Sequence, residues 1–352
     1  MKTTRFLFGL MFLLGLTATL NKATAHEEKK SEEKKPSKVE YAIVVHGGAG
    51  GNPASWSDRQ KETRIAAMTE AVNIGKKILA EGGTSLDAVE QVVRYLENNP
   101  MFNAGRGAVF TAAGKNELDA AIMDGSNMKC GAVAGVTTVK NPISLARKVM
   151  TETKHVLLIS GGAETFADEM EVERVDPDYF KTRGRKEEQE RAQEIDKINA
   201  QRLAQGLPEL KEKYSYVGTV GCVALDKHGN LAAATSTGGM SNKKYGRVGD
   251  VPIIGAGTFA DNRICGISCT GHGEEFIRHS AAHEVSAMMK YGGKSLQEAS
   301  NAVIHETLKG FDGGMICIDK EGNISMPFNT RGMPRAAADS NGLFEVKLGI
   351  EE

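Results

Sequence analysis

Apolar residues fall into short runs typical of buried strands and into longer stretches with the spacing of amphipathic helices. In the first part of the chain, strands are expected at 41–45, 108–112, 117–123, 130–137 and 155–159. Helices are expected at 58–80, 85–96 and 142–151, and Gly161-Gly162 opens a further short helix. This half therefore contains both element types, with two helices between its first strand and the others.

The same pattern resumes after residue 218. Strands are expected at 219–225, 231–237, 253–259, 264–270, 314–318, 324–327 and 344–346, and helices at 274–290 and 295–308. Short turns such as 226–230 join successive strands, which favours antiparallel sheets with helices gathered on one face. The pattern predicts an α+β fold, a four-layer α/β/β/α sandwich in which two mainly antiparallel sheets, one from each half, pack face to face.

Residues 176–214 break this pattern because they are crowded with Lys, Arg, Glu and Gln and contain few large apolar side chains. The stretch 185–204 has a composition compatible with a helix but shows no apolar face to bury. We expect a flexible linker over about 176–218, outside the sandwich and between its halves. A long insert of this kind indicates either a boundary or a functional segment.

The N-terminus has the features of a secretory signal. Lys2 and Arg5 precede an apolar run over 6–20, and the small residues 23–25 follow it. The run is too short for a convincing membrane span. We therefore expect a signal peptide at 1–25, a charged tether at 26–39, and a periplasmic or secreted protein without a membrane anchor once the signal is removed.

Composition narrows the range of partners and metal sites that the chain could have. The chain has 44 basic and 45 acidic residues, a balance that gives no reason to expect nucleic acid as a partner. The count of five cysteines is odd, so at least one thiol must be free, and no Cys or His spacing matches a zinc site. The candidate chemistry must therefore come from other residue types.

Thr219 stands at the start of a predicted strand, directly after the predicted linker. A cut before Thr219 would create an N-terminal threonine, which carries a nucleophilic hydroxyl and a basic α-amine on one residue. Gly218 has no side chain to obstruct attack on its carbonyl. An α-amine with an ordinary pKa of about 7.7–8.0 is partly neutral near neutral pH and can accept the hydroxyl proton.

Several strings of residues occur together in one order. They are Gly-Thr-Val-Gly-x-Val-Ala-Leu-Asp from 218, Thr-Ser-Thr-Gly-Gly from 235, Gly-Arg-Val-Gly-Asp from 246 and Thr-Gly-His-Gly-Glu from 270, with His-Gly-Gly-Ala-Gly from 46 and Phe-Asn-Ala-Gly-x-Gly-Ala from 102. With these strings the chain closely resembles the plant-type asparaginase/isoaspartyl aminopeptidase family of N-terminal-nucleophile (Ntn) hydrolases. The resemblance implies self-cleavage between Gly218 and Thr219, into an alpha subunit (40–218) and a beta subunit (219–352) that form one domain.

Arg247 and Asp250 suit the two ends of an amino-acid substrate. The planar guanidinium of Arg247 can bind an α-carboxylate through two hydrogen bonds, and the carboxylate of Asp250 suits an α-ammonium. Their spacing on a glycine-bearing loop lets both side chains project into one pocket. A plain salt bridge between the two residues is the structural alternative.

The resemblance assigns further roles within the same site. Thr237 is expected to hydrogen-bond the nucleophile, and Asn103 to lie beside it. The Thr270 hydroxyl and the Gly271 N–H are expected to form the oxyanion hole and to contact substrate, with the Gly273 backbone lining the pocket. We expect His272 to be structural and the His46-Gly47-Gly48 stretch to pack tightly beside the site, since it lacks the remainder of a phosphate-binding loop.

No cofactor is expected for the chemistry. The loop from residue 96 to 106 resembles the sodium-binding loop of the family, in which backbone carbonyls hold a structural ion. The corresponding residues here are Leu96, Glu97, Asn99, Phe102, Ala104 and Arg106.

The function implied is hydrolysis of β-aspartyl (isoaspartyl) dipeptides and L-asparagine through an acyl-enzyme on Thr219, with release of L-aspartate. The family pattern also suggests an (alpha-beta)2 heterotetramer. One alternative is hydrolysis of glycosylated asparagine, although relatives of that type typically carry Asp where this chain has Gly218. The other is an exported amino-acid-binding protein that uses Arg247 and Asp250 without catalysis. The two-lobed fold of such a protein requires parallel βαβ units.

Overall fold

A computed structural model describes residues 38–210 and 218–350 of the chain. The predicted signal peptide (1–25), nearly all of the predicted tether (26–39) and residues 211–217 of the predicted linker lie outside the described residues. The helices of the described part include none with the length and hydropathy needed to span a membrane.

The larger of two sheets has eight strands in the order β12-β11-β1-β5-β6-β2-β3-β4. Its strands are β1 (Ala42–His46), β2 (Leu118–Asp124), β3 (Cys130–Val136), β4 (Leu157–Ile159), β5 (Val220–Leu225), β6 (Leu231–Thr237), β11 (Gly332–Asp339) and β12 (Phe344–Gly349). All neighbours are antiparallel except β3 and β4. The smaller sheet is antiparallel throughout, in the order β10 (Ile324–Ser325), β9 (Gly313–Asp319), β8 (Cys265–Gly271) and β7 (Thr258–Asp261).

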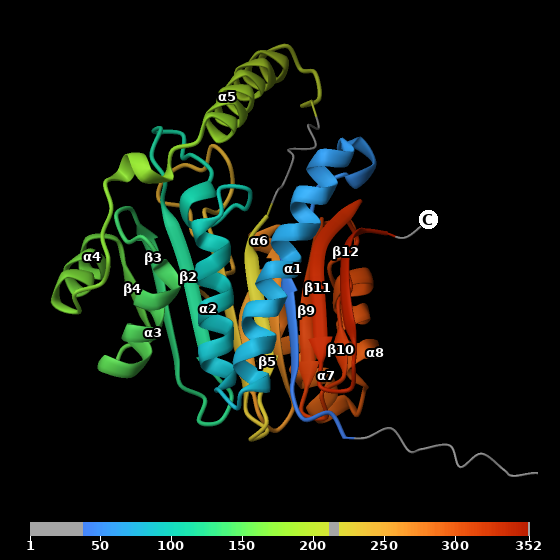
Figure 1. Ribbon diagram of the computed structural model, residues 1–352. Coiled ribbons are helices and arrows are strands. Elements are labelled where there is room, and N and C mark those ends of the chain that lie inside the picture. The colour runs from blue at the N-terminus through green and yellow to red at the C-terminus, as the bar shows by residue number, and fades with distance from the viewer. Residues whose placement is uncertain (1–37, 211–217, 351–352) are drawn as a thin grey trace, which may run out of the picture. The chain divides into compact units, whose positions relative to one another are not determined.

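The two sheets pack face to face, since β1 contacts β9, β5 contacts β8 and β6 contacts β7. Helices α1 (Asp58–Ala80), α2 (Ser85–Asn98) and α3 (Pro142–Glu152) cover the outer face of the large sheet, where Figure 1 shows α1 and α2 in front of the strands. Helices α7 (Ala281–Gly292) and α8 (Leu296–Ala302) pack on the small sheet. The predicted α/β/β/α sandwich with two mainly antiparallel sheets is confirmed.

The two helices that follow β1 begin at strong capping residues. Ser57 caps α1 in a reciprocal capping box with Gln60, and the Thr84 side chain caps α2 by accepting a bond from the Asp87 N–H. The apolar stripe of α2, which includes Val89, is buried against β5 and β6. Both helices match their predicted positions closely.

The expectation of one sheet from each half is wrong. Strands β5, β6, β11 and β12 of the second half join β1–β4 in the large sheet, and the small sheet comes from the second half alone. Val44 of β1 pairs with Val223 of β5 on one side and with Ala337 of β11 on the other. The pattern of apolar residues identifies strands but carries no information about which distant strands pair.

Strand β11 was not expected, because Pro334 and Arg335 interrupt its apolar pattern. The pairing of β11 with β12 shifts register between Gly332 and Arg335, at an irregular site where a proline is tolerated. The predicted strand at 108–112 does not form. The side chain of Asn103 accepts a bond from the Val109 N–H, and that of Asn116 donates to the Ala108 and Val109 carbonyls, in place of a neighbouring strand.

Other boundaries differ more modestly. Residues 253–257 form a bend and turns with an isolated bridge at Ile254, and β7 begins only at Thr258. The predicted helix 274–290 is divided at Ser280, whose φ of 48° ends α6 (Gly273–His279) before α7 starts. The predicted helix 295–308 is α8 followed by a π-helical turn at Val303–Thr307.

The prediction that the charged segment buries nothing is wrong for its helical part. Helix α5 (Arg183–Ala204) buries Ala192 and Ile195 together with the polar residues Arg185 and Gln189. In Figure 1, α5 extends beyond the ends of the strands. Half of its buried residues are polar side chains that donate to backbone carbonyls, which a search for apolar periodicity does not detect.

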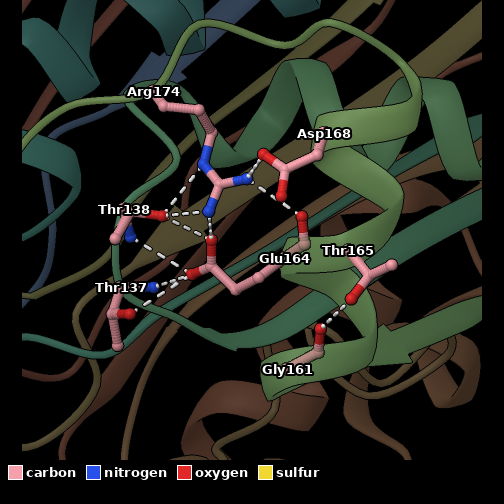
Figure 2. A network of polar contacts seen from close by, with 7 residues as sticks. All are labelled: Thr137, Thr138, Gly161, Glu164, Thr165, Asp168 and Arg174. Carbon is pink, nitrogen blue, oxygen red and sulfur yellow. Dashed lines mark hydrogen bonds and ion pairs between the residues drawn. The ribbon is translucent and has the colours of Figure 1, made fainter.

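The chain that leads into α5 is fixed by an ionic network, shown in Figure 2. The carboxylate of Glu164, on α4 (Ser160–Glu169), accepts hydrogen bonds from the backbone N–H groups of Thr137 and Thr138. The Arg174 guanidinium bonds to Glu164, Asp168 and the Thr138 hydroxyl. Arg174 thereby ties the segment before α5 to the end of β3.

Candidate active site

The Thr219 side chain lies at the start of β5 and is only 7% exposed. Its hydroxyl donates a hydrogen bond of 3.2 Å to Oγ1 of Thr237, at the end of the adjacent strand β6. The same Thr237 oxygen accepts a bond of 2.9 Å from the Gly239 N–H. The predicted contact between Thr219 and Thr237 is present, and its catalytic role remains a prediction.

Gly218 is enclosed by two other loops. A Cβ placed on Gly218 would lie 2.6 Å from the Thr270 Oγ1, and one on Gly48 would lie 2.3 Å from the Gly218 carbonyl oxygen. The φ of Gly48 is +101°, a conformation that favours glycine. The predicted tight packing of this glycine stretch is therefore confirmed, and it surrounds the peptide unit that the nucleophile would attack.

Thr270 and Gly271 end strand β8 beside Gly218. The Thr270 hydroxyl accepts a bond of 3.1 Å from the Ala49 N–H. Gly271 has a φ of +149°, and a Cβ there would clash with the Asp312 carbonyl oxygen at 2.5 Å. These contacts fix both predicted oxyanion-hole residues next to the candidate scissile bond.

Asn103 holds two loops together and is not hydrogen-bonded to the nucleophile. Its Nδ2 donates to the Gly239 carbonyl at 2.8 Å, and its Oδ1 accepts from the Val109 N–H at 3.0 Å. Its own carbonyl accepts a bond of 3.1 Å from the Gly238 N–H. Asn103 thus fixes the turn that carries the Gly239 N–H toward Thr237.

A buried polar network lies beside β5, and the sequence singled out only His46 among its members. The Nε2 of His46 is hydrogen-bonded to the Ser268 hydroxyl at 3.0 Å, and Ser268 is hydrogen-bonded to Thr235 at 2.7 Å. Burial lowers the His46 pKa to about 3, and a hydrogen bond with the Thr219 backbone opposes this only partly. His46 is therefore neutral at physiological pH and supports the strand that carries Thr219.

Arg247 has a partner that the sequence did not predict. Its Nε and Nη2 donate to the two carboxylate oxygens of Glu274 on α6, each at 2.9 Å. The predicted structural alternative, an ion pair with Asp250, is not the arrangement seen. Glu274 occurs in one of the motif strings, but nothing in its spacing shows that it faces Arg247. These two bonds leave both N–H groups of Nη1 and one of Nη2 available for a further carboxylate.

Asp250 is buried with an unsatisfied oxygen. Its Oδ2 has no hydrogen-bond partner in the described part of the chain, and burial raises its pKa to about 6. A Cβ on Gly273 would lie 2.7 Å from the Arg247 Nη2 and 2.9 Å from the Asp250 Oδ1, so only glycine leaves room there. An unpaired buried carboxylate oxygen suits a cationic ligand.

One pocket connects these groups. Its lining includes Thr219, Thr237, Gly271, Arg247, Asp250 and Asn103 from the predicted set. Met240, Ser241 and Glu188 also line it and were not predicted. The candidate nucleophile, one residue of the predicted oxyanion hole (Gly271) and a pair of opposite charges therefore line one space.

The predicted sodium loop is tightly packed around two glycines. A Cβ on Gly105 would lie 2.3 Å from the Glu97 carbonyl oxygen, and one on Gly107 would lie 2.0 Å from that of Phe102. Only glycine therefore fits directly beside these two predicted ligands. The described residues contain no group of His, Cys, Asp and Glu that could hold a metal ion, but backbone oxygens are suitable ligands for a hard cation.

Glu97 also has a buried side chain that the sequence did not indicate. Its carboxylate accepts bonds from the Ser236 hydroxyl at 2.7 Å, from Asn141 Nδ2 at 3.1 Å and from the Ile143 N–H at 3.1 Å. Burial nevertheless raises its pKa from 4.5 to about 7. Glu97 joins the end of α2 to β6 and to the start of α3.

This shift makes stability depend on pH. Between pH 4.5 and 7 the folded state keeps a proton on Glu97 that the unfolded state loses. Stability should therefore fall by roughly 2–3 kcal/mol as pH rises through this window. Urea unfolding at pH 5 and pH 8 should show this loss as the difference between the wild type and Glu97→Gln, because Asp250 and His46 also have shifted pKa values and contribute equally in both proteins. The exposed Glu190→Gln serves as a control, and equal pH dependence in all three proteins would contradict the assignment.

Known proteins resemble this chain over most of its length. Residues 39–348 match the model of a family described as "Asparaginase". A putative isoaspartyl peptidase/L-asparaginase of Dictyostelium discoideum is 47% identical, and the alignment covers 83% of this chain and 92% of that protein. The isoaspartyl peptidase of Escherichia coli (strain K12) is 50% identical, with 84% and 91% covered.

The plant-type L-asparaginase of Pyrococcus furiosus is 44% identical, with 88% of this chain and 99% of that protein covered. The family match thus includes both the strands that carry the candidate nucleophile and the loop that carries Arg247 and Asp250. Together with the sandwich of two mainly antiparallel sheets, these matches show that the chain belongs to the asparaginase family of Ntn hydrolases.

Proposed function

We propose that this protein cleaves itself before Thr219 and then hydrolyses β-aspartyl dipeptides and L-asparagine, releasing L-aspartate. The observation that carries the proposal is the buried hydrogen bond from the Thr219 hydroxyl to Thr237, in a pocket that also contains Arg247 and Asp250. The relatives named isoaspartyl peptidase and L-asparaginase support this choice of substrates.

Self-cleavage uses the intact peptide bond as its substrate. The Thr219 Oγ1 attacks the Gly218 carbonyl, the hydroxyl proton passes to the Thr219 nitrogen as the C–N bond breaks, and an ester forms between the two residues. Water then hydrolyses the ester, giving a carboxylate on Gly218 and a free amine on Thr219. The close packing of Gly48 and Thr270 around Gly218 supports this step, because it holds the carbonyl in one orientation.

In the mature enzyme, the amine of Thr219 accepts the hydroxyl proton as Oγ1 attacks the substrate β-carbonyl. The Thr270 hydroxyl and the Gly271 N–H stabilise the negative charge that develops on the carbonyl oxygen. Collapse of the intermediate expels ammonia or an amino acid, which takes up the proton, and leaves a β-aspartyl ester. Water hydrolyses this ester and L-aspartate leaves.

The charged residues position the substrate. Arg247 binds the α-carboxylate, and the unpaired oxygen of Asp250 binds the α-ammonium, beside the space that Gly273 leaves open. Hydrolysis of glycosylated asparagine is less well supported, because Gly218 stands where those enzymes typically carry Asp. A binding protein built from parallel βαβ units is not supported, since β3 with β4 is the one parallel pair among the named strands.

The test begins with the purified wild-type protein on a denaturing gel. We expect two fragments, and N-terminal sequencing of the smaller one should begin at Thr219. Release of L-aspartate should then be measured from L-asparagine, from β-aspartyl dipeptides and from glycosylated asparagine. A single uncleaved band without hydrolysis would refute the proposal, whereas a preference for glycosylated asparagine would favour the alternative.

The same proposal includes export by the predicted signal peptide and assembly of the cleaved chain as an (alpha-beta)2 heterotetramer. Cell fractionation and light scattering of the cleaved protein test these two points. Recovery of the protein in the cytoplasm with residues 1–25 intact would contradict export, and a mass matching a single alpha-beta unit would contradict the heterotetramer.

We also propose that a sodium ion bound by carbonyls of the 96–106 loop stabilises the fold. Replacing NaCl with choline chloride at equal ionic strength should lower Tm by several degrees, because a ligand that binds only the folded state stabilises it by mass action. Potassium and lithium chloride serve as controls for ion size. Equal Tm values in all of these salts would contradict a sodium site.

A further inference from the structure

Helix α5 contributes a charged residue to the pocket that contains Thr219. Glu188 lines this pocket, although it lies in the charged segment between the two halves of the chain. Its side chain is 17% exposed, and its Oε2 accepts a bond of 2.8 Å from Arg185. The mechanism above gives Glu188 no role.

Helix α5 is anchored on both sides of the pocket. Arg185 Nε donates to the Gly107 carbonyl at 2.8 Å, and the Gln189 side chain donates to the Thr111 carbonyl. On the other side, Asp196 accepts bonds from Asn242 at 3.0 Å and from Lys244 at 2.9 Å. All anchoring residues of α5 precede the proposed cut, so cleavage before Thr219 leaves the helix attached to the same partners.

The proposed binding mode assigns part of the pocket lining to the aspartyl group and leaves the rest for the leaving group. The aspartyl part of a substrate is held near Arg247 and Asp250, with its β-carbonyl at Thr219. The leaving group must therefore extend away from that charged pair. The lining residues that are left to contact the leaving group include Val109, Met240 and Glu188.

We propose that Glu188 selects the leaving group and favours β-aspartyl dipeptides whose second residue has a cationic side chain. This inference rests on the proposed function of the same site. A carboxylate can accept several hydrogen bonds, so the bond to Arg185 leaves capacity for a ligand ammonium or guanidinium. A lysine or arginine side chain is long enough to extend from the scissile bond toward the pocket wall, whereas an acidic side chain meets like charge.

The test compares kcat/KM for β-Asp-Lys, β-Asp-Leu, β-Asp-Glu and L-asparagine. The wild type should prefer β-Asp-Lys to β-Asp-Glu by about fivefold to tenfold, the size expected for one partly buried charge contact. Glu188→Gln should reduce this ratio to about twofold or less, and Glu188→Asp should restore part of it. Activity on L-asparagine should change less than activity on β-Asp-Lys, because its leaving group is ammonia and cannot reach Glu188.

Glu190→Gln provides the matched control, since it makes the same charge change at an exposed position of α5. It should keep the wild-type ratio. Equal ratios in the wild type and Glu188→Gln, with good activity on L-asparagine, would overturn the role of Glu188 and leave the proposed function intact. Absence of hydrolysis of every substrate by the cleaved wild type would instead overturn the proposed function, and this inference with it.

Discussion

Replacing Thr219 with alanine should leave the purified protein as a single uncleaved chain that hydrolyses neither L-asparagine nor β-aspartyl dipeptides. The change removes a methyl group and the hydroxyl, and the hydroxyl oxygen is the proposed nucleophile of both self-cleavage and turnover. The loss of activity should be at least about 10⁴-fold, as for removal of a nucleophile in other hydrolases. Gel electrophoresis and an L-aspartate release assay measure the two effects on the same preparation.

Thr219→Ser is the matched control, because it keeps the hydroxyl and removes only a methyl group. It should still be cut, more slowly, and should retain measurable hydrolysis. The alanine variant should fold, since Thr219 loses a single hydrogen bond to Thr237, and its Tm should stay within a few degrees of the wild type. Cleavage of the alanine variant at the same bond would show that another group attacks Gly218.

Asp250→Asn should separate turnover from self-cleavage. The substitution preserves shape and removes the charge that binds the substrate ammonium, so kcat/KM should fall by about 10²–10³-fold. Cutting before Thr219 should proceed as in the wild type, because the groups packed around Gly218 are Gly48, Ala49 and Thr270. Steady-state kinetics and a time course of cleavage test the two halves of this prediction.

Thermal stability provides a second readout for Asp250→Asn, and it should move in the opposite direction to activity. Burial raises the Asp250 pKa to about 6, so above that pH the folded wild type carries a buried charge without a full set of partners. Asp250→Asn removes this cost, and at pH 8 its Tm should equal or exceed that of the wild type. A variant that lost activity and several degrees of Tm together would point to a structural role for Asp250.

The residues that the sequence identified best are those carried by short, complete motifs. Thr219 and Thr237 are brought together by the pairing of β5 with β6, two strands joined by a short turn that the sequence makes evident. Gly271 and Gly273 follow from one uninterrupted string. In each case local sequence was enough, because the neighbours in space are close in the chain or belong to the same motif.

Contacts between distant segments were not predictable in this way. Glu274 binds the loop residue Arg247 from helix α6, and Glu188 reaches the pocket from a segment whose composition is typical of an unfolded linker. Helix α5 is held by bonds from polar side chains to backbone carbonyls, which leave no apolar period in the sequence. The pairing of β1 with β11 likewise joins opposite ends of the chain.

The position of β1 in the large sheet has a consequence for how the protein can be made. This strand precedes the proposed cut, yet both of its neighbours, β5 and β11, follow it. Each fragment synthesised alone would present open strand edges and half of a core, a state prone to aggregation. The two fragments, expressed from separate genes, should therefore not combine into active protein on mixing. Both fragments must fold as parts of the uncut chain, before cleavage.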